Sequence, residues 1–253
     1  MPDQLVQYSA DRAVARIALD SPRHRNALSA AMIEQLTAAV TSAADDDSVR
    51  AIELTHTGST FCAGIDLSEA RQGGMRTGAE RVMALLRLIV AVPKPVVGSI
   101  DGHVRAGGLG LAGACDIVVA GPRSTFAFTE VRLGLAAAMI SLTTLPRMQP
   151  RAASRYFLTG ETFDAPAAAA IGLITEAVED IDAGTAAVLD ALRAASPQGL
   201  RETKALLTPE LLSGFDARAA ELAELSARLF DSPEAAEGMA AFLAKRPPAW
   251  AAG

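Results

Sequence analysis

A glycine-rich stretch is the first candidate for chemistry in this chain of 253 residues. Residues 108–113 (GLGLAG) match the spacing G-x-G-x-x-G, in which a backbone turn cradles the pyrophosphate of a dinucleotide. In that motif a strand runs almost directly into the first glycine, whereas here residues 101–107 separate Gly108 from the strand expected at 95–100. The match is therefore weak. Taken alone, the glycines favour a tight turn and close helix packing.

Cysteines and histidines give no sign of a metal site or of a nucleophilic triad. The two cysteines, Cys62 and Cys115, form no CxxC pair, and His24, His56 and His103 do not have the spacing of a metal cluster. No Ser-His-Asp arrangement can be recognised from residue order alone. The sequence predicts no metal, no redox cofactor and no disulfide framework, and two free thiols fit a reducing compartment.

The charge balance weighs against nucleic acid as a partner. Asp and Glu number 29 against 23 Lys and Arg, which gives a formal charge of -6. Nucleic-acid binding depends on clustered basic residues. Residues 1–15 mix acidic and polar residues with apolar ones, and no apolar run approaches the length of a membrane span. We therefore expect a cytoplasmic protein without a membrane segment.

Strands and helices alternate through the first 195 residues, which predicts an α/β fold. A hairpin is expected at residues 5–19, and Ser29 is a candidate N-cap for an amphipathic helix that ends near Asp45. Further buried strands are expected at 51–55, 95–100 and 117–120, and a helix at 109–114.

From about Ser196 the chain becomes almost purely helical. Thr208, followed by proline and glutamate, has the signature of an N-cap; Ser232 starts another helix, which the prolines at 247–248 should end. An apolar stripe on the first of these helices should pack on the core or on another subunit; it comprises Phe215, Leu222, Leu225 and Leu229. We divide the chain into a core, 1–195, and a C-terminal helical oligomerisation region, 196–253.

Several motifs in fixed order resemble those of the crotonase superfamily, the enoyl-CoA hydratase/isomerase family. They are NAL at 26–28, FCAGIDL at 61–67, PKPVVGSIDG at 93–102, AGGL at 106–109, ACDI at 114–117, TG at 159–160, AIGL at 170–173 and FLAKRP at 242–247. The resemblance covers nearly the whole chain. It implies a spiral of ββα units, a C-terminal helical region and assembly into homotrimers often paired as homohexamers. It also implies an acyl-CoA substrate and no cofactor, because coenzyme A is part of the substrate.

The resemblance also assigns two backbone amides to catalysis. A thioester carbonyl gathers negative charge when a proton leaves its α-carbon, and preorganised amide donors stabilise that charge. By resemblance the donors are the N–H groups of Ile65 and Gly107, the second at the start of a helix whose dipole favours an anion. Asp66 has a first-turn position, where capping or orienting the loop is favoured over acid-base catalysis.

The expected acid-base residue is Glu130. Many hydratases of this family use two glutamates; the first position here is Gly110, and residues 126–134 (FAFTEVRLG) resemble the segment that carries the second. A single carboxylate in an apolar pocket should have a raised pKa and could move a proton between two carbons, which is isomerase chemistry. Hydration stays open. A non-catalytic role also stays open, in which Glu130 is a surface residue or caps a neighbouring helix.

Other family positions are expected to hold the substrate. Arg25 is a candidate contact to the CoA phosphates, and Phe242 and Lys245 resemble residues that reach CoA across a subunit boundary, although Lys245 is equally explained as a cation at a helix C-terminus. The full set of expected substrate contacts is Arg25, Ala27, Ala63, Asp66, Leu67, Gly108, Phe242 and Lys245.

One segment departs from the family pattern. Residues 136–140 (AAAMI) replace a Pro/Gly-rich turn and should be more helical and more apolar, which leaves the length of the acyl chain open. Other crotonase reactions, such as thioester hydrolysis or decarboxylation, stay open too, because fold similarity does not choose among them. A different class of function, acyl-CoA binding without turnover, is motivated by Gly110 and this altered segment.

Overall fold

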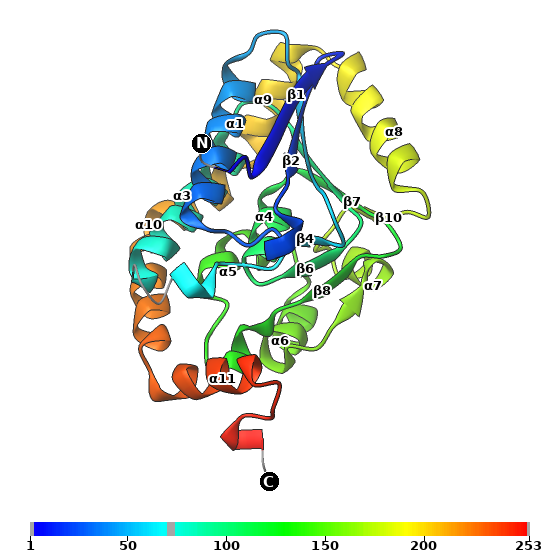
Figure 1. Ribbon diagram of the computed structural model, residues 1–253. Coiled ribbons are helices and arrows are strands. Elements are labelled where there is room, and N and C mark those ends of the chain that lie inside the picture. Colours follow the sequence, from blue (N-terminus) through cyan, green and yellow to red (C-terminus); the bar gives the residue numbers. More distant parts are fainter. Residues whose placement is uncertain (1–2, 70–73, 252–253) are drawn as a thin grey trace.

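Two β-sheets form the framework of the computed structural model, which describes residues 3–69 and 74–251 (Figure 1). The larger sheet has the order β1-β2-β3-β5-β7-β10 and the smaller sheet β4-β6-β8-β9. β1 and β2 form the expected antiparallel hairpin, and the remaining pairs of the larger sheet are parallel. The strands are β1 (Val6–Asp11), β2 (Val14–Leu19), β3 (Ala51–His56), β4 (Thr60–Cys62), β5 (Val96–Ile100), β6 (His103–Arg105), β7 (Ile117–Ala120), β8 (Thr125–Ala127), β9 (Phe163–Asp164) and β10 (Glu176–Ala177).

A ββα unit repeats along the chain. Each time, the chain leaves a strand of the larger sheet, turns, adds a strand to the smaller sheet and then enters a helix. β3 and β4 precede α3 (Met75–Ala91), β5 and β6 precede α4 (Gly107–Ala114), and β7 and β8 precede the short helix η2 (Thr129–Leu133) and α5 (Ala138–Thr144). This confirms the predicted spiral of ββα units.

Side-chain hydrogen bonds connect the turns between the two sheets. Asn26 is fully buried, and its Nδ2 donates to the carbonyl oxygens of Thr57 and Thr60. His56 Nε2 accepts from the backbone amide of Asp101, and the Asp101 carboxylate in turn accepts from the backbone and guanidinium of Arg123. Successive turns are thereby held in fixed register, which matters because the chain runs from them into the candidate site.

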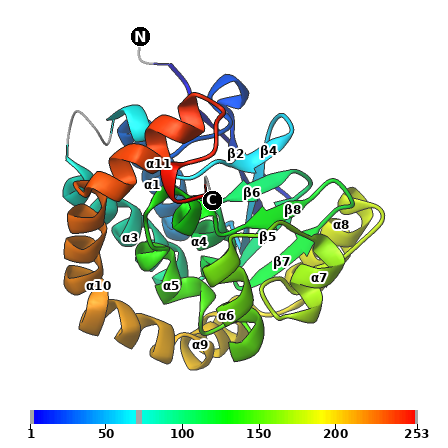
Figure 2. The ribbon, with the colours of Figure 1, turned by 90° about the horizontal axis from the view of Figure 1, so that it is seen from below.

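Helices lie on both faces of the larger sheet. α8 covers one face through a cluster that includes Val14, Ala51, Val97 and Leu189, and Figure 2 shows it on the opposite side of β5 and β7 from α3, α4 and α5. Ser29 caps α1 as predicted, because its hydroxyl accepts from the amide of Met32. The helices not yet named are η1 (Pro22–His24), α1 (Ala30–Asp45), α6 (Pro150–Thr159), α7 (Ala165–Ala170), α8 (Ile181–Ala194), α9 (Pro197–Leu207), α10 (Pro209–Phe230), α11 (Pro233–Leu243) and η3 (Ala249–Ala251).

The C-terminal helices pack on the core of their own chain. α10 lies against α3 and α5, and Phe215 and Leu222 of the apolar stripe are part of the main core. The stripe therefore gives no support to oligomerisation, and the proposed boundary at residue 196 stays a prediction. Lys204 of α9 is buried and pairs with Asp116 (Nζ–Oδ2 2.7 Å), which attaches α9 to the strand region.

Two details of helix termination differ from the sequence-based expectation. Thr208 makes no side-chain cap for α10; its hydroxyl donates instead to the carbonyl of Lys204, at the end of α9. α11 ends at Leu243, before the prolines at 247–248, because Lys245 takes a left-handed conformation (φ 52°). In the described part of the chain, no helix combines the length and apolarity needed to cross a bilayer.

Candidate active site

Three segments that the sequence singles out follow the carboxyl ends of adjacent parallel strands. β4 pairs with β6 and β6 with β8 in the smaller sheet. Ile65 comes shortly after β4, Gly107 after β6 and Glu130 after β8. Because parallel strands end at the same edge of a sheet, the topology brings these three residues to one side of the fold, where α/β proteins commonly bind ligands.

The Ile65 amide is oriented by a parallel bridge to the Asn26-Ala27-Leu28 segment. Leu28 N–H donates to the carbonyl of Gly64 (2.7 Å), and Asp66 N–H donates to the carbonyl of Leu28. Since successive N–H groups of an extended chain point to opposite sides, the N–H of Ile65 points away from Leu28. No acceptor for it is found among residues 3–69 and 74–251.

The Gly107 amide is at the N-terminus of α4, where the first four N–H groups have no partner within the helix. Ala106, the residue before it, has φ 46° and ψ -118°, a strained conformation for a side chain with a Cβ. The Ile65 and Gly107 loops touch. Gly64 has φ +98°, and a Cβ placed there would lie 2.7 Å from Ala106 Cβ and 3.1 Å from Gly107 N. Glycine is thus required at position 64 for both its conformation and its space.

Glu130 has the electrostatic character of an acid-base group. The residue as a whole is half-buried, but its Oε2 is enclosed and has no hydrogen-bond partner in the described part of the chain. Burial raises the pKa of this carboxyl to about 7, because desolvation disfavours the charged form. A non-catalytic role as an exposed or helix-capping carboxylate does not fit, because Oε2 is enclosed and lacks a hydrogen-bond partner among the described residues.

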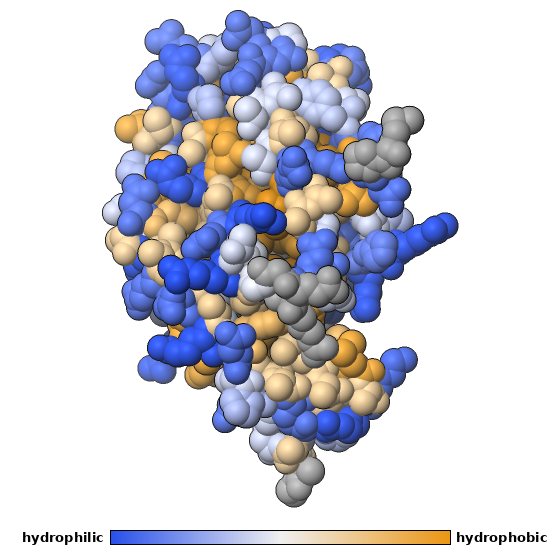
Figure 3. Space-filling model, turned by 60° about the vertical axis from the view of Figure 1, so that its left-hand side comes forward, coloured by the Kyte–Doolittle hydropathy of each residue, from blue (hydrophilic) through white to orange (hydrophobic). Residues whose placement is uncertain are grey.

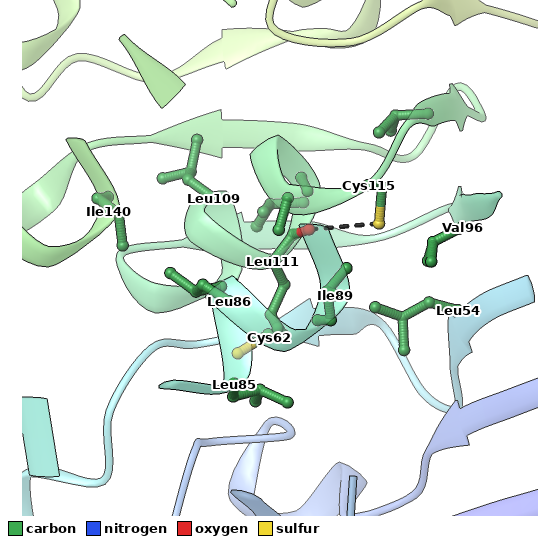
Figure 4. Packing of buried hydrophobic residues seen from close by; sticks show 14 of the residues in the cluster. Leu54, Cys62, Leu85, Leu86, Ile89, Val96, Leu109, Leu111, Cys115 and Ile140 are labelled. Carbon is green, nitrogen blue, oxygen red and sulfur yellow. Dashed lines mark hydrogen bonds between the residues drawn. The ribbon is translucent and has the colours of Figure 1, made fainter. Parts of the chain in front are cut away.

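The space beside Gly110 is filled by hydrocarbon. A Cβ at this position would lie 2.7 Å from Ile140 Cγ2 and 3.0 Å from Leu86 Cδ1. Thr143 Oγ1 also donates to the carbonyl of Gly110 (3.0 Å), so α4 and α5 are in close contact. Figure 4 shows Ile140 and Leu86 among the buried side chains around α4. We expected the altered segment 136–140 to be helical. Helix α5 begins only at Ala138, so this prediction is wrong for residues 136–137.

Most of the residues expected to contact the substrate lie around the loops that carry Ile65 and Gly107. The carbonyl of Arg25 accepts from the amide of Ala63 (3.1 Å), which places the exposed Arg25 and the half-buried Ala27 next to the Ile65 loop. Gly108 packs closely against Cys62, because a Cβ at position 108 would lie 2.6 Å from the Cys62 carbonyl oxygen.

Asp66 caps its own loop, as expected: its Oδ1 accepts from the amides of Ser68 and Glu69. Leu67 packs against a small apolar cluster next to Ile65. Phe242 and Lys245 lie at the end of α11 and are exposed, Phe242 to 56%.

Asn26 was part of a motif in the sequence, but sequence reasoning gave it no role of its own. It is fully buried, accepts from the amide of Ser21 (2.7 Å) and fixes the segment that orients Ile65. Its positive φ of 51° is a conformation that asparagine tolerates better than most residues. An asparagine next to a turn was the available signal, but its partners at 57 and 60 lie far along the sequence.

Known proteins resemble this chain over nearly its full length. The family model described as enoyl-CoA hydratase/isomerase matches residues 9–253. A crystal structure of an enoyl-CoA hydratase from Mycobacterium avium is 53% identical, with a TM-score of 0.93 over 98% of this chain and 99% of that one. An enoyl-CoA hydratase structure from Mycobacterium smegmatis is 30% identical, with a TM-score of 0.80 over 98% and 100%.

A sequence relative from a vertebrate agrees with these structures. Enoyl-CoA hydratase domain-containing protein 3, mitochondrial, from Danio rerio is 31% identical over 94% of this chain and 84% of its own length. The match to the family model, the shared fold and the order of the motifs all indicate the same family. This chain belongs to the enoyl-CoA hydratase/isomerase family.

Proposed function

We propose that this protein is an enzyme that moves the double bond of an enoyl-CoA thioester, with Glu130 as its single acid-base group. The observation that carries the proposal is the enclosed, unpartnered Glu130 Oε2, whose pKa of about 7 suits both uptake and return of a proton near neutral pH. Its position after β8, next to the loops that end β4 and β6, supports a role on the same ligand.

The reaction starts from a 3-enoyl thioester. Glu130 takes a proton from C2, and the electron pair of that C–H bond moves toward the carbonyl oxygen, which accepts hydrogen bonds from Ile65 N–H and Gly107 N–H. The electron pair then returns to form the C2–C3 double bond, the former C3–C4 double bond opens, and C4 takes the proton from Glu130. No atom is gained or lost. Each amide donor contributes about 3–4 kcal/mol in comparable sites.

Hydration is the second candidate, because the relatives compared above are named hydratases. Water addition needs a group that positions the water in addition to the group that delivers the proton. At position 110, where two-acid family members carry the first of their two glutamates, the nearest neighbours of a new Cβ are carbon atoms of Ile140 and Leu86. This apolar contact favours isomerisation. Acyl-CoA binding without turnover, and thioester hydrolysis or decarboxylation, are the remaining outcomes of an activity screen.

Glu130→Gln tests the role of the carboxylate. The variant keeps the side-chain volume, so affinity for a saturated acyl-CoA should be unchanged, while turnover should fall about 100- to 10,000-fold. Glu34→Gln, on the exposed side of α1, is the matched control and should leave both quantities unchanged. Near-normal turnover in the Glu130 variant would remove this residue from the mechanism.

The proposal includes a homotrimer or homohexamer in which Phe242 and Lys245 reach the CoA of a neighbouring subunit. Phe242 and Leu243 are 56% and 66% exposed at the end of α11, and Figure 3 shows apolar side chains gathered at the lower end of the molecule, where α11 lies. Light scattering at micromolar concentration should give a multiple of the 26.2 kDa chain mass. A monodisperse monomer would refute the assembly.

A further inference from the structure

The position of the Glu130 carboxylate depends on the backbone of the helix that carries it. Among residues 3–69 and 74–251, no group donates a hydrogen bond to its enclosed Oε2. Glu130 is the second residue of η2, a 3-10 helix of five residues. Such short helices have poor hydrogen-bond geometry and little stability of their own. The elements that pack against η2 must therefore hold the carboxylate in place.

Helix α11 holds one side of η2 by backbone contact. A Cβ at Gly238 would lie 2.5 Å from the carbonyl oxygen of Leu133, the last residue of η2. A Cβ at Gly134, the next residue, would lie 2.7 Å from the carbonyl carbon of Glu234. Contacts this short leave no room for side chains, so η2 rests directly on α11.

An aromatic stack joins the start of η2 to α6. Phe128, directly before η2, is 1% exposed, and its ring stacks on that of Phe157 in α6 with the ring centroids 4.1 Å apart. Phe163 lies 6.4 Å from Phe128 and 4.0 Å from Tyr156, so the stack continues into β9 and back to α6. Rings at these separations attract one another. The stack fixes the backbone two residues before Glu130.

The end of α6 also contacts η2. Arg132 Nε donates to the carbonyl of Thr159 (3.2 Å). Gly160 ends α6 with φ +61°, and a Cβ there would lie 3.1 Å from both the Phe128 carbonyl oxygen and Arg132 Nε. The TG motif at 159–160, which has no role in substrate binding or proton transfer as described above, thus forms a turn whose missing side chain lets η2 lie against it.

We propose that Phe157 and Gly160 position Glu130 for proton transfer. We call these two residues the α6 platform: they contact η2 on both sides of Glu130 and act through its backbone. The inference rests on the proposed function, in which the Glu130 carboxylate must reach both C2 and C4 of the substrate. A misplacement of about 1 Å in such a site can lower the rate about 100-fold.

Phe157→Leu tests the α6 platform, because it removes the ring beneath Phe128 and keeps an apolar side chain. On a 3-enoyl-CoA, kcat should fall about 10- to 100-fold, and KM should change less than about twofold, since the thioester is still bound by the same two amides. Phe157→Tyr keeps the ring and should keep kcat. Phe215→Leu is the matched control: it removes a ring that is 2% exposed in the main core, on α10, and should lower stability without lowering kcat.

A double variant separates positioning from a general loosening of the fold. When Phe157→Leu is added to Glu130→Gln, turnover should fall less than about twofold further, because no carboxylate is left to position. A further fall as large as in the wild-type background would overturn the proposal. So would an unchanged kcat in folded Phe157→Leu, or an equal fall in Phe157→Tyr or Phe215→Leu.

Gly160→Ala gives a second route to the same comparison if Phe157→Leu does not fold. The new Cβ would press on the Phe128 carbonyl and should lower kcat about 10- to 100-fold. Gly172→Ala is its control, because Gly172 also has a positive φ (+85°) but a Cβ there would meet the carbonyl of Arg147 instead of η2. Equal kcat values in the two alanine variants would contradict the platform.

These outcomes are distinguishable from failure of the proposed function. Near-normal turnover in Glu130→Gln alone would overturn the proposed function, and with it the positioning role, before any change in α6 is made. Impaired turnover in Glu130→Gln together with full turnover in Phe157→Leu would overturn the α6 platform alone.

Discussion

Replacing Glu130 by glutamine should change how stability depends on pH, independently of any activity. Burial raises the pKa of this carboxyl from its ordinary 4.5 to about 7. A raised acid pKa in the folded state means that the carboxyl's contribution to stability is fully present below about pH 4.5 and is lost as the pH rises through about 7. At 1.36 kcal/mol per pKa unit, the loss amounts to about 3 kcal/mol.

Glutamine cannot ionise, so the variant escapes this loss. We expect the free energy of unfolding of Glu130→Gln, relative to wild type, to increase by about 3 kcal/mol between about pH 4.5 and about pH 8. Urea unfolding followed by circular dichroism at both pH values measures it, and all other titrating groups cancel in the comparison. Glu34→Gln should show a difference that does not depend on pH. A pH-independent difference for Glu130→Gln would show that its carboxyl is not held neutral by burial.

Three further substitutions test the framework around the site. Lys204→Met leaves the largely enclosed Asp116 carboxylate, whose side chain is 13% exposed, without its cation, and urea unfolding should show a loss of about 3 kcal/mol. Asn26→Ala removes three hydrogen bonds, two of them buried, and should cost about 3 kcal/mol in the same assay; a loss below about 1 kcal/mol would mean that the turns do not depend on it. Gly64→Ala puts a Cβ into a left-handed position in contact with the Gly107 loop, so turnover should fall at least about tenfold, and full turnover would contradict the roles of the amides.

Local signals in the sequence were sufficient for much of the fold. The hydroxyls of Ser29 and Ser232 cap α1 and α11 as their positions predict, and the strand and helix pattern indicates the ββα order. Thr208 had the same signature, yet its hydroxyl bonds to the preceding helix. A cap signature shows that a helix can start at a residue; which of two adjoining helices the side chain serves depends on three-dimensional geometry.

The candidate site was predicted in part. Motif order pointed to Ile65, Gly107 and Glu130, and the parallel register of β4, β6 and β8 explains why segments so far apart in sequence end at one edge. Sequence alone could not show that Ile140 fills the space beside Gly110, because that contact joins two helices of different repeats.

The apolar stripe of α10 also had two equivalent interpretations in the sequence. Periodicity identifies a buried face without identifying its partner, which here is the chain's own core. The hydrogen bonds of Asn26, His56 and Asp101 between successive turns leave no local pattern at all, since their partners lie roughly 20 to 45 residues away.

The rates of the wild-type protein on a matched pair of substrates test the central claim most directly. A 3-enoyl-CoA and the 2-enoyl-CoA of the same chain length are supplied separately, and double-bond migration and water addition are each followed by product analysis. With Glu130 as the only identified acid-base group, migration on the 3-enoyl substrate should be much faster than hydration of the 2-enoyl substrate. Efficient hydration of crotonyl-CoA without isomerisation of a 3-enoyl-CoA would contradict the single-carboxylate mechanism.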